Sequence, residues 1–354
     1  MYFHQVVAAA GPDDPRISCA RNLGAVLSQC GESRVFVVGD APVDAGIEPL
    51  WTFPSVGSQD GVILFHGGEG NPAALRFLLE RPEPLVLIYR SPPPMESFEL
   101  NDPHRAAMIH WGQRELELLR PRVALAVADS RPAGQDLEAL GYVDVVTIPV
   151  GLDVGRLRRV DPDENAMQTL SAYVGDPLVV AVGELLAHER LDVILHAQLV
   201  LHRIGLSSTL AIVGPSTDPV TARALQEHAR DLGIPMCLML GALGEDALAA
   251  VMRRADIVVT ASEHRGSSPA VLEALAMGVP VIARDSGGLA DTVGAGGMVL
   301  PADTGAVELA EAVSEVHADR RLAQELGAHG RRRADELVLD RNISAFLDEL
   351  AEVI

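Results

Sequence analysis

The sequence predicts an α/β protein made of two doubly wound domains, each a parallel sheet with helices on both faces. Its 354 residues exceed what one hydrophobic core usually serves, so two domains of ordinary size are expected. The composition is 48% hydrophobic but only 4% aromatic, as in α/β proteins rich in Ala, Val and Leu. Short apolar runs rich in β-branched residues alternate with helical segments, and this alternation favours parallel sheets.

Residues 1–152 are expected to form the first domain. Its strands are short apolar runs, and polar or glycine-containing turns separate them from the helices. The predicted strands are Tyr2–Ala10, Arg34–Val38, Gly61–Phe65, Leu85–Tyr89, Val123–Ala128 and Val143–Ile148. The predicted helices are Arg16–Cys30, Asn71–Glu80, Pro103–Arg120 and Gln135–Leu140.

The second domain is expected at residues 177–337, after a polar linker at residues 153–176 and before a last helix within residues 338–354. The same alternation of apolar runs and helical segments supports it. The predicted strands are Pro177–Val182, Thr209–Val213, Met236–Leu240, Ala255–Ala261 and Val279–Ala283. The predicted helices are Leu191–Ile204, Pro219–Leu232, Glu245–Arg253, Pro269–Met277, Thr304–His317, Ala318–Leu337 and Asn342–Val353.

The segment Ser262–Arg284 combines a strand end, a glycine turn, a helix and the next strand. Ser268 is a natural N-cap, Pro269 suits the first helical position, and Gly278 ends the helix. The exposed amides of such a helix start, together with the positive end of the helix dipole, favour phosphate or another anion. The segment is therefore interpreted as the floor of a ligand site.

This segment resembles the donor-sugar site of the retaining GT-B glycosyltransferases of family 4. The motif of that family has the form S-E-H-E-G-F-x-x-P-x-x-E-A-x-A-x-G-x-P-V-x-A and is followed by a Gly-Gly turn. The residues in register with it are Ser262, Glu263, His264, Gly266, Glu273, Ala274, Ala276, Gly278, Pro280, Val281, Ala283, Gly287 and Gly288. The segments in the first half that also resemble the family are Ile63–His66, Val86–Tyr89, Ala126–Ser130 and Ile148–Asp153.

The resemblance implies the GT-B fold, in which two Rossmann-like domains face a central cleft and the C-terminal helix crosses back to the first domain. It also implies that the second domain binds a nucleotide-sugar donor and that the first binds the acceptor. The family does not usually require a metal ion, and no cofactor is expected.

The chain departs from the family motif where the donor would carry its charge. Arg265 stands in place of the first of two paired glutamates, and Ser267 in place of a phenylalanine. Glu184 and Glu189 stand where relatives have an Arg and a Lys that neutralise the diphosphate. At about 4 Å and an effective dielectric of about 20, one such exchange turns about 4 kcal/mol of attraction into a similar repulsion.

Three explanations of these glutamates are open. Arg190 and Arg265 could supply the missing cations. A divalent metal could bridge a glutamate to the diphosphate. Alternatively, the glutamates only complement the dipole of a helix start, and no diphosphate binds in the usual place.

The resemblance also suggests roles for individual residues. Glu273 would hydrogen-bond the nucleotide ribose. The full set of candidate donor-binding residues is Gly183, Glu184, Arg190, Gly214, Arg265, Gly266, Ser267, Ser268 and Glu273.

Two residues of the first domain are candidate catalytic residues. His66 follows a buried strand and precedes two glycines, so it is either a residue of the cleft or a capped, structural histidine. Arg90 occupies the position of a family histidine that contacts the transferring sugar or its phosphate, and it either binds a phosphate or forms an ordinary ion pair with a loop carboxylate. Asp13, Asp14 and Arg16 are candidate acceptor-binding residues, or else part of a solvated turn with Asp as the helix cap.

The net charge of −21 argues against binding of nucleic acid or an anionic membrane surface and favours a soluble acceptor. The chain contains no lysine, so an anion site must use Arg, His or backbone amides. Cys19, Cys30 and Cys237 lack metal-ligand spacing and are expected to be reduced packing residues. Neither a membrane span nor a secretory leader is evident, and a cytoplasmic protein is expected.

These observations lead to two functional hypotheses. The first is a retaining glycosyltransferase with an atypical donor site, acting on a soluble acceptor. The second is a catalytically inactive glycosyltransferase-like protein that serves as a binding module or as the partner of an intact glycosyltransferase. A phosphate-binding enzyme on the same fold, such as a phosphorylase, is a third class. A homodimer is left open.

Overall fold

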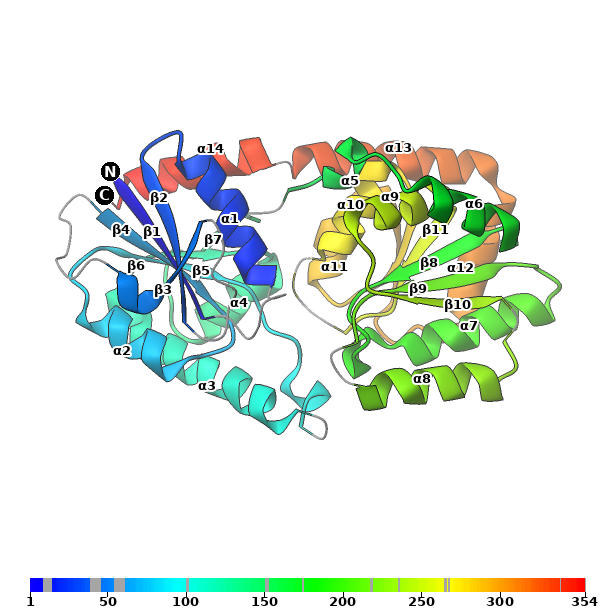
Figure 1. The fold of residues 1–354 in the computed structure, drawn as a ribbon, viewed down its shortest axis with the longest axis horizontal. Coiled ribbons are helices and arrows are strands. Elements are labelled where there is room, and N and C mark those ends of the chain that lie inside the picture. Colours follow the sequence, from blue (N-terminus) through cyan, green and yellow to red (C-terminus); the bar gives the residue numbers. More distant parts are fainter. Residues whose placement is uncertain are drawn as a thin grey trace. The chain divides into compact units, whose positions relative to one another are not determined.

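The computed structural model divides the chain into two compact units (Figure 1). Unit 1 comprises residues 1–153 and 338–354, and unit 2 comprises residues 154–337. The residues described are 1–8, 15–38, 46–53, 61–99, 102–149, 153–173, 175–216, 219–234, 236–263, 266, 268–337 and 339–353.

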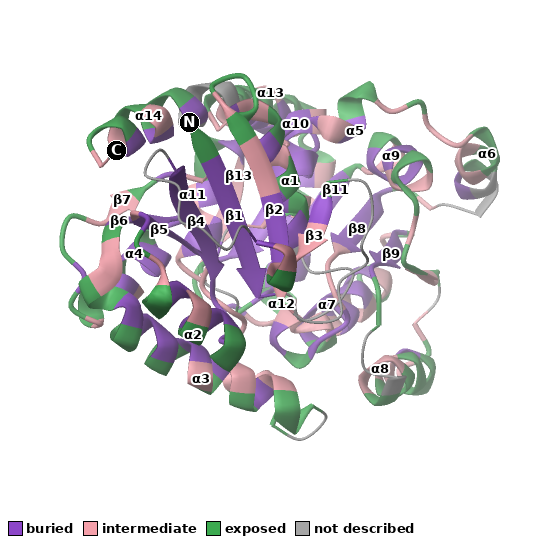
Figure 2. Cartoon of the chain, turned by 60° about the vertical axis from the view of Figure 1, so that its left-hand side comes forward, coloured by how far each residue is buried: buried purple, intermediate pink, exposed green. Residues whose placement is uncertain are grey.

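Unit 1 contains a seven-stranded parallel sheet in the order β3-β2-β1-β4-β5-β6-β7. The central strands are buried along nearly their whole length, as Figure 2 shows for β1 and β4. The strands are β1 (Tyr2–Ala8), β2 (Glu32–Val38), β3 (Ile47–Pro49), β4 (Gly61–Gly67), β5 (Leu85–Tyr89), β6 (Val123–Ala128) and β7 (Val146–Thr147). The helices are α1 (Pro15–Leu27), α2 (Pro72–Glu80), α3 (Pro103–Leu119), α4 (Arg131–Ala139) and α14 (Leu339–Ala351).

Unit 2 contains a six-stranded parallel sheet in the order β10-β9-β8-β11-β12-β13. Helices α7, α8 and α12 supply buried side chains to the core on one face of this sheet. The strands are β8 (Leu178–Val182), β9 (Thr209–Val213), β10 (Cys237–Gly241), β11 (Ile257–Thr260), β12 (Val281–Arg284) and β13 (Gly297–Leu300). The helices are α5 (Arg156–Arg159), α6 (Glu164–Tyr173), α7 (Leu191–Arg203), α8 (Pro219–Asp231), α9 (Glu245–Arg254), α10 (Pro269–Met277), α11 (Gly288–Val293), α12 (Ala306–Ala318) and α13 (Arg320–Glu336).

The two parallel sheets with their helices confirm the predicted fold class. Several local expectations differ from the structure: α4 begins at Arg131 and not at Gln135, α14 begins at Leu339 and not at Asn342, and two larger differences follow. The stretch expected as a linker contains α5 and α6, which contact α9 and α10. The strand expected at Val143–Ile148 is reduced to β7, because Val143 is exposed and Asp144 has a left-handed backbone conformation with φ 53°. None of the helices in the described part of the chain has the length and hydrophobicity needed to cross a membrane.

The C-terminal helix α14 belongs to the core of unit 1, as the predicted crossover requires. Ile343, Phe346 and Leu350 are buried on the same side of the sheet as Phe3 and Leu23. The side chain of Phe346 has no exposed surface. The last helix therefore completes the first unit and is part of its stability.

We expect Phe346→Ala to destabilise unit 1 by about 3–5 kcal/mol, because it removes a fully buried aromatic ring and leaves a cavity. Both tryptophans, Trp51 and Trp111, lie in unit 1, so tryptophan fluorescence during urea unfolding reports on this unit. Asp348→Ala, an exposed change on the same helix, is the control. Equal unfolding midpoints for the two variants would show that α14 does not stabilise unit 1.

Candidate active site

The carboxyl edge of the sheet in unit 2 is where a ligand is expected, because the strand order reverses there. The chain runs from β8 outward to β9 and β10, and then returns to β11 on the other side of β8. In open parallel sheets, ligands bind beyond the strand ends at this reversal of strand order. The loops after β8 and β11 are therefore the first place to look for a site.

Two glycines bring the strand ends of this edge into close contact. Gly183 follows β8, and Gly214 follows β9 with φ 154°. A Cβ atom on Gly214 would stand only 1.7 Å from the carbonyl oxygen of Gly183. Only glycine fits there, so the two backbones form the floor of this edge without intervening side chains.

The N-terminus of α10 lies at the same edge, because the helix follows β11. Ser268 is the N-cap, and its hydroxyl accepts a hydrogen bond from the amide of Val271 at 3.4 Å. Pro269 opens the helix and Gly278 closes it with φ 77°. These features match the local prediction, and they leave a helix start suited to an anion.

The loop after β8 is acidic and lies against this floor. The carboxyl carbon of Glu189 is 3.3 Å from the place where a Cβ on Gly183 would stand. His188 is buried, and its Nε2 is 3.3 Å from Glu189 Oε1. Glu184 is half-buried in the same loop. The predicted Gly183, Glu184 and Glu189 are thus close in space, with a histidine that the sequence did not single out.

Arg190 joins the loops after β8 and β11. It donates from Nε and Nη2 to the two carboxylate oxygens of Asp192, at 3.0 and 3.1 Å. Its Nη1 donates to Glu263 Oε1 at 2.7 Å. The hydrogen bonds to Asp192 raise the pKa of Arg190 above its ordinary value, and the bond to Glu263 adds a smaller effect in the same direction. The candidate donor cation is therefore already paired with two carboxylates.

The backbone supports this arrangement of Arg190. Arg190 has a left-handed conformation, with φ 49° and ψ 42°, and stands at the N-cap of α7. The amide of Glu263 donates to the carbonyl of His188 at 2.8 Å, which ties the two loops together. A non-glycine residue with positive φ is uncommon and needs such support from its surroundings.

Glu273 is buried in α10 and contacts α5. Its Oε2 accepts a hydrogen bond from the amide of Leu157 at 3.3 Å, and its Oε1 is 3.8 Å from Nε of Arg156. Arg156 also donates to Glu245 at 2.7 Å. Glu273, which the family resemblance suggested as the ribose ligand, thus binds helix α5 near the start of unit 2.

Four predicted site residues, Asp13, Asp14, Arg265 and Ser267, lie outside the described residues. Gly266, between the last two, is buried. Within the described parts of the chain, no three His, Cys, Asp or Glu side chains are grouped so that they could hold a metal ion.

His66 lies at the end of β4 and is buried. Its Nε2 is 2.9 Å from Oε1 of Gln5, and Gln5 also donates to the carbonyl of Ala20 in α1. These contacts link two strands and a helix within the core of unit 1. Of the two roles considered for His66, they support the structural one.

Arg90 follows β5 and has a mostly buried side chain. Its Nε is 3.9 Å from Oδ2 of Asp129, which follows the neighbouring strand β6. This is the ion pair with a loop carboxylate that the sequence left as the alternative to phosphate binding.

Arg16 is buried at the start of α1 and binds the loop after β4. Its Nη1 donates to the carbonyl of Glu69 at 3.3 Å, and its Nη2 is 3.9 Å from the Glu69 carboxylate. Arg105 of α3 donates to the other oxygen of that carboxylate at 3.0 Å. Arg16 therefore lies at the carboxyl edge of the sheet, as its candidate role in acceptor binding requires, and Glu69 and Arg105 join it there.

Glu115 of α3 is buried beneath the same loop. Its Oε2 accepts a hydrogen bond from the amide of Asn71 at 2.6 Å. Burial raises the pKa of this carboxyl to about 7, and the Asn71 amide and the charge of Arg16 act in the opposite direction. Glu115 thus changes its charge near neutral pH.

The sequence pointed to neither Glu115 nor the partners of Arg190. The match of Glu263 to the family motif was the only sequence signal for this residue, and it did not indicate a contact with Arg190. Its pairing with Arg190 joins residues 73 positions apart, and no local pattern indicates it.

We expect Glu115→Gln to stabilise unit 1 more at pH 8 than at pH 5. The folded state holds the Glu115 proton up to about pH 7, whereas the unfolded chain releases it near pH 4.5, so this group lowers stability as the pH rises between the two values. The gain at pH 8 is of the order of 1–3 kcal/mol. Urea unfolding followed by tryptophan fluorescence at both pH values measures it.

Glu117→Gln, at an exposed position on the same helix, is the control for this prediction. A stability difference between Glu115→Gln and the parent that stays constant from pH 5 to pH 8 would contradict it.

A comparison with known protein families finds a match that lies within unit 2. Residues 176–319 match the family model of the group 1 glycosyl transferases. The D-inositol 3-phosphate glycosyltransferase of Rhodococcus erythropolis is 29% identical over 249 residues, which cover 67% of this chain and 55% of that protein.

A second relative is the GDP-mannose-dependent alpha-(1-6)-phosphatidylinositol monomannoside mannosyltransferase of Mycolicibacterium smegmatis. It is 33% identical over 195 residues, which cover 52% of this chain and 50% of that protein. The chain thus spans about half the length of the curated relatives it matches.

Solved structures match over nearly the whole chain. The Anabaena protein HepE in complex with UDP has a TM-score of 0.75 at 15% identity and covers 99% of this chain and 100% of its own. The sucrose-phosphate synthase of Thermosynechococcus elongatus has a TM-score of 0.77 at 18% identity, and the match covers 99% of this chain and 98% of the synthase chain. At these identities the likeness concerns the fold, which is GT-B, and within unit 2 residues 176–319 are similar to the group 1 glycosyl transferases.

Proposed function

We propose that this protein is a retaining glycosyltransferase that moves a sugar from a nucleotide-diphosphate donor to a soluble acceptor. The observation that carries the proposal is the carboxyl edge of unit 2, where α10 starts at the same edge as the strand reversal floored by Gly183 and Gly214. The family match covers this edge, and the names of the relatives describe sugar transfer. The donor belongs to unit 2 and the acceptor to unit 1.

The reaction needs charge stabilisation on the leaving diphosphate more than it needs a protein nucleophile. Backbone amides at a helix start provide fixed donors that require no rearrangement as negative charge develops. At the N-terminus of α10 the amides of Ser268 and Ala270 can donate. Pro269 has no N–H, and the amide of Val271 is bonded to the Ser268 hydroxyl. Ser268 and Pro269 shape that terminus, and their role is to position it.

Arg190 is the proposed cation of this atypical donor site. A diphosphate placed at the floor of the edge would compete with Glu263 for the guanidinium, while Asp192 keeps the arginine in position from its own helix. Exchange of one anionic partner for another keeps the guanidinium paired, and the displaced carboxylate of Glu263 is exposed enough to be solvated by water. Glu184 and Glu189 would still oppose the ligand, so we expect weaker donor binding than an Arg/Lys pair would give.

The direct test is isothermal titration of the purified chain with UDP, GDP, dTDP and ADP and with their common sugar conjugates, each with and without magnesium. Micromolar binding of one nucleotide is the expected result, and the corresponding sugar nucleotide is then used in transfer assays. If no nucleotide binds, the proposed donor site is wrong, and a role as a partner of an intact glycosyltransferase takes its place.

We expect Arg190→Gln to weaken binding of the selected nucleotide about tenfold or more, because a charge-assisted hydrogen bond to the diphosphate is lost. Glu263→Gln should strengthen binding severalfold, because it removes the competing carboxylate. Isothermal titration of both variants measures the two effects.

Arg203→Gln is the matched control, since it makes the same change of charge at the far end of the same helix, α7. If Arg190→Gln and Arg203→Gln bind the nucleotide equally well, Arg190 does not belong to the donor site.

A further inference from the structure

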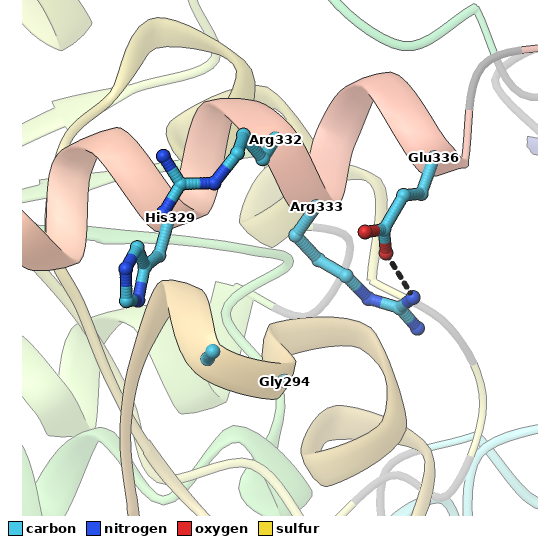
Figure 3. A pocket seen from close by; sticks show the side chains of 6 residues that line it. Gly294, His329, Arg332, Arg333 and Glu336 are labelled. Carbon is cyan, nitrogen blue, oxygen red and sulfur yellow. Dashed lines mark hydrogen bonds and ion pairs between the residues drawn. The ribbon is translucent and has the colours of Figure 1, made fainter.

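Unit 2 contains a pocket of about 290 Å³ between α13 and the turn that follows α11. Figure 3 shows His329 and Arg332 next to each other on α13, and the ion pair of Arg333 with Glu336 further along the helix. Gly294 and Ala295 complete the lining. The helical residues follow the spacing of one helix face, and all four are polar or charged.

The pocket lies at the opposite edge of the sheet from the proposed donor site. Helix α11 begins at Gly288, directly after β12, and therefore starts at the carboxyl edge. Its last residue precedes Gly294, and the chain then enters β13 at Gly297. Because β13 is parallel to β12, its first residue marks the amino edge. A ligand here would not share contacts with a donor at the start of α10.

One wall of the pocket is held rigidly by Arg333. Its Nη2 donates to the carbonyl of Asp291 at 2.7 Å, its Nε to the carbonyl of Thr292 at 3.4 Å, and its Nη1 to Glu336 at 2.9 Å. Gly294 makes room for this side chain, because a Cβ there would be 3.3 Å from Nε of Arg333 and the backbone φ is 50°. The carboxylate of Glu336 is thus presented at a fixed position.

The other wall, formed by His329 and Arg332, is open. Both side chains are exposed, and neither has a hydrogen-bond or ion-pair partner in the part of the chain that the structure describes. The chain has 49 acidic and 28 basic residues, so carboxylates are plentiful. The neighbouring acidic residues pair with other arginines: Glu336 with Arg333, and Asp335 with Arg158.

We propose that this pocket binds a small phosphate monoester of about the size of a sugar phosphate. Arg332 can hold a phosphate through two parallel hydrogen bonds, and His329, one turn earlier, can donate a further one. Glu336 accepts from a hydroxyl group of the same molecule while Arg333 holds it in place. The volume lies just below the roughly 300–1,000 Å³ of sites for drug-sized molecules and suits a ligand of this smaller size.

The test is isothermal titration of the full chain with glucose 6-phosphate, inorganic phosphate and glucose. Glucose 6-phosphate should bind most tightly, inorganic phosphate more weakly, and glucose not detectably. Arg332→Gln should weaken binding of glucose 6-phosphate about tenfold or more, because it removes a charge-assisted pair. His329→Gln should weaken it severalfold.

Arg321→Gln is the matched control, since Arg321 is an exposed arginine on the same helix and its partner is Glu325. It should leave the affinity for glucose 6-phosphate unchanged. The same titration on Arg190→Gln separates this site from the donor edge and should also show no change. The outcome is independent of whether nucleotides bind.

Two results would overturn the proposal. If Arg332→Gln binds glucose 6-phosphate as tightly as the parent, the arginine only complements the carbonyl end of α13. If Arg190→Gln alone loses the ligand, the phosphate binds at the donor edge and the pocket on α13 is not its site.

Discussion

The close packing of α10 on α13 is the constraint on which the ligand-binding features of unit 2 depend. A Cβ on Gly327 of α13 would lie 2.4 Å from the carbonyl oxygen of Gly278, and one on Gly330 would lie 3.2 Å from the side chain of Leu275. Two glycines one turn apart thus let the helix backbones approach each other. This contact fixes the direction of α10 and hence the place where its N-terminus meets the carboxyl edge. The same packing also turns the polar face of α13 toward the end of α11, where the pocket forms.

Ion pairing decides which charges of this acidic chain remain available. Arginine is its only permanently charged side-chain cation, and a planar guanidinium can bind two carboxylates at once. Arg190 does so with Asp192 and Glu263, and Arg156 lies between Glu245 and Glu273. A cation held in this way is positioned but neutralised. An anionic ligand can bind such an arginine only by replacing one of its carboxylates. The geometry of the ligand therefore decides whether it binds, more than its net charge does.

Local signals predicted much of the fold and part of the candidate site. The N-cap at Ser268, the proline at Pro269 and the terminal Gly278 lie within one segment, and the structure has each of them in the expected role. Helix α6 was missed because its residues look polar and linker-like, and its contact with α9 is a tertiary feature. The partner of Glu273 could not be predicted, because Leu157 is 116 residues away. The pairing of His66 with Gln5 likewise depends on strand order, which places β4 beside β1.

Helix α11 runs from the carboxyl edge of the sheet, where the donor site is proposed, to the pocket at the amino edge, so it matters whether this short helix can transmit a change between the two edges. At its start, the amide of Gly287 donates to Asp285 at 2.8 Å, and within it the hydroxyl of Thr292 donates to the carbonyl of Gly288 at 2.7 Å. At its end, Arg333 donates to the carbonyls of Asp291 and Thr292. Coupling between sites requires an element with two arrangements that the ligands favour differently. Hydrogen bonds hold α11 at both ends, and the proposed phosphate ligand would meet Arg332 and His329 without displacing Arg333. The geometry therefore favours independent binding at the two edges, with free energies that add.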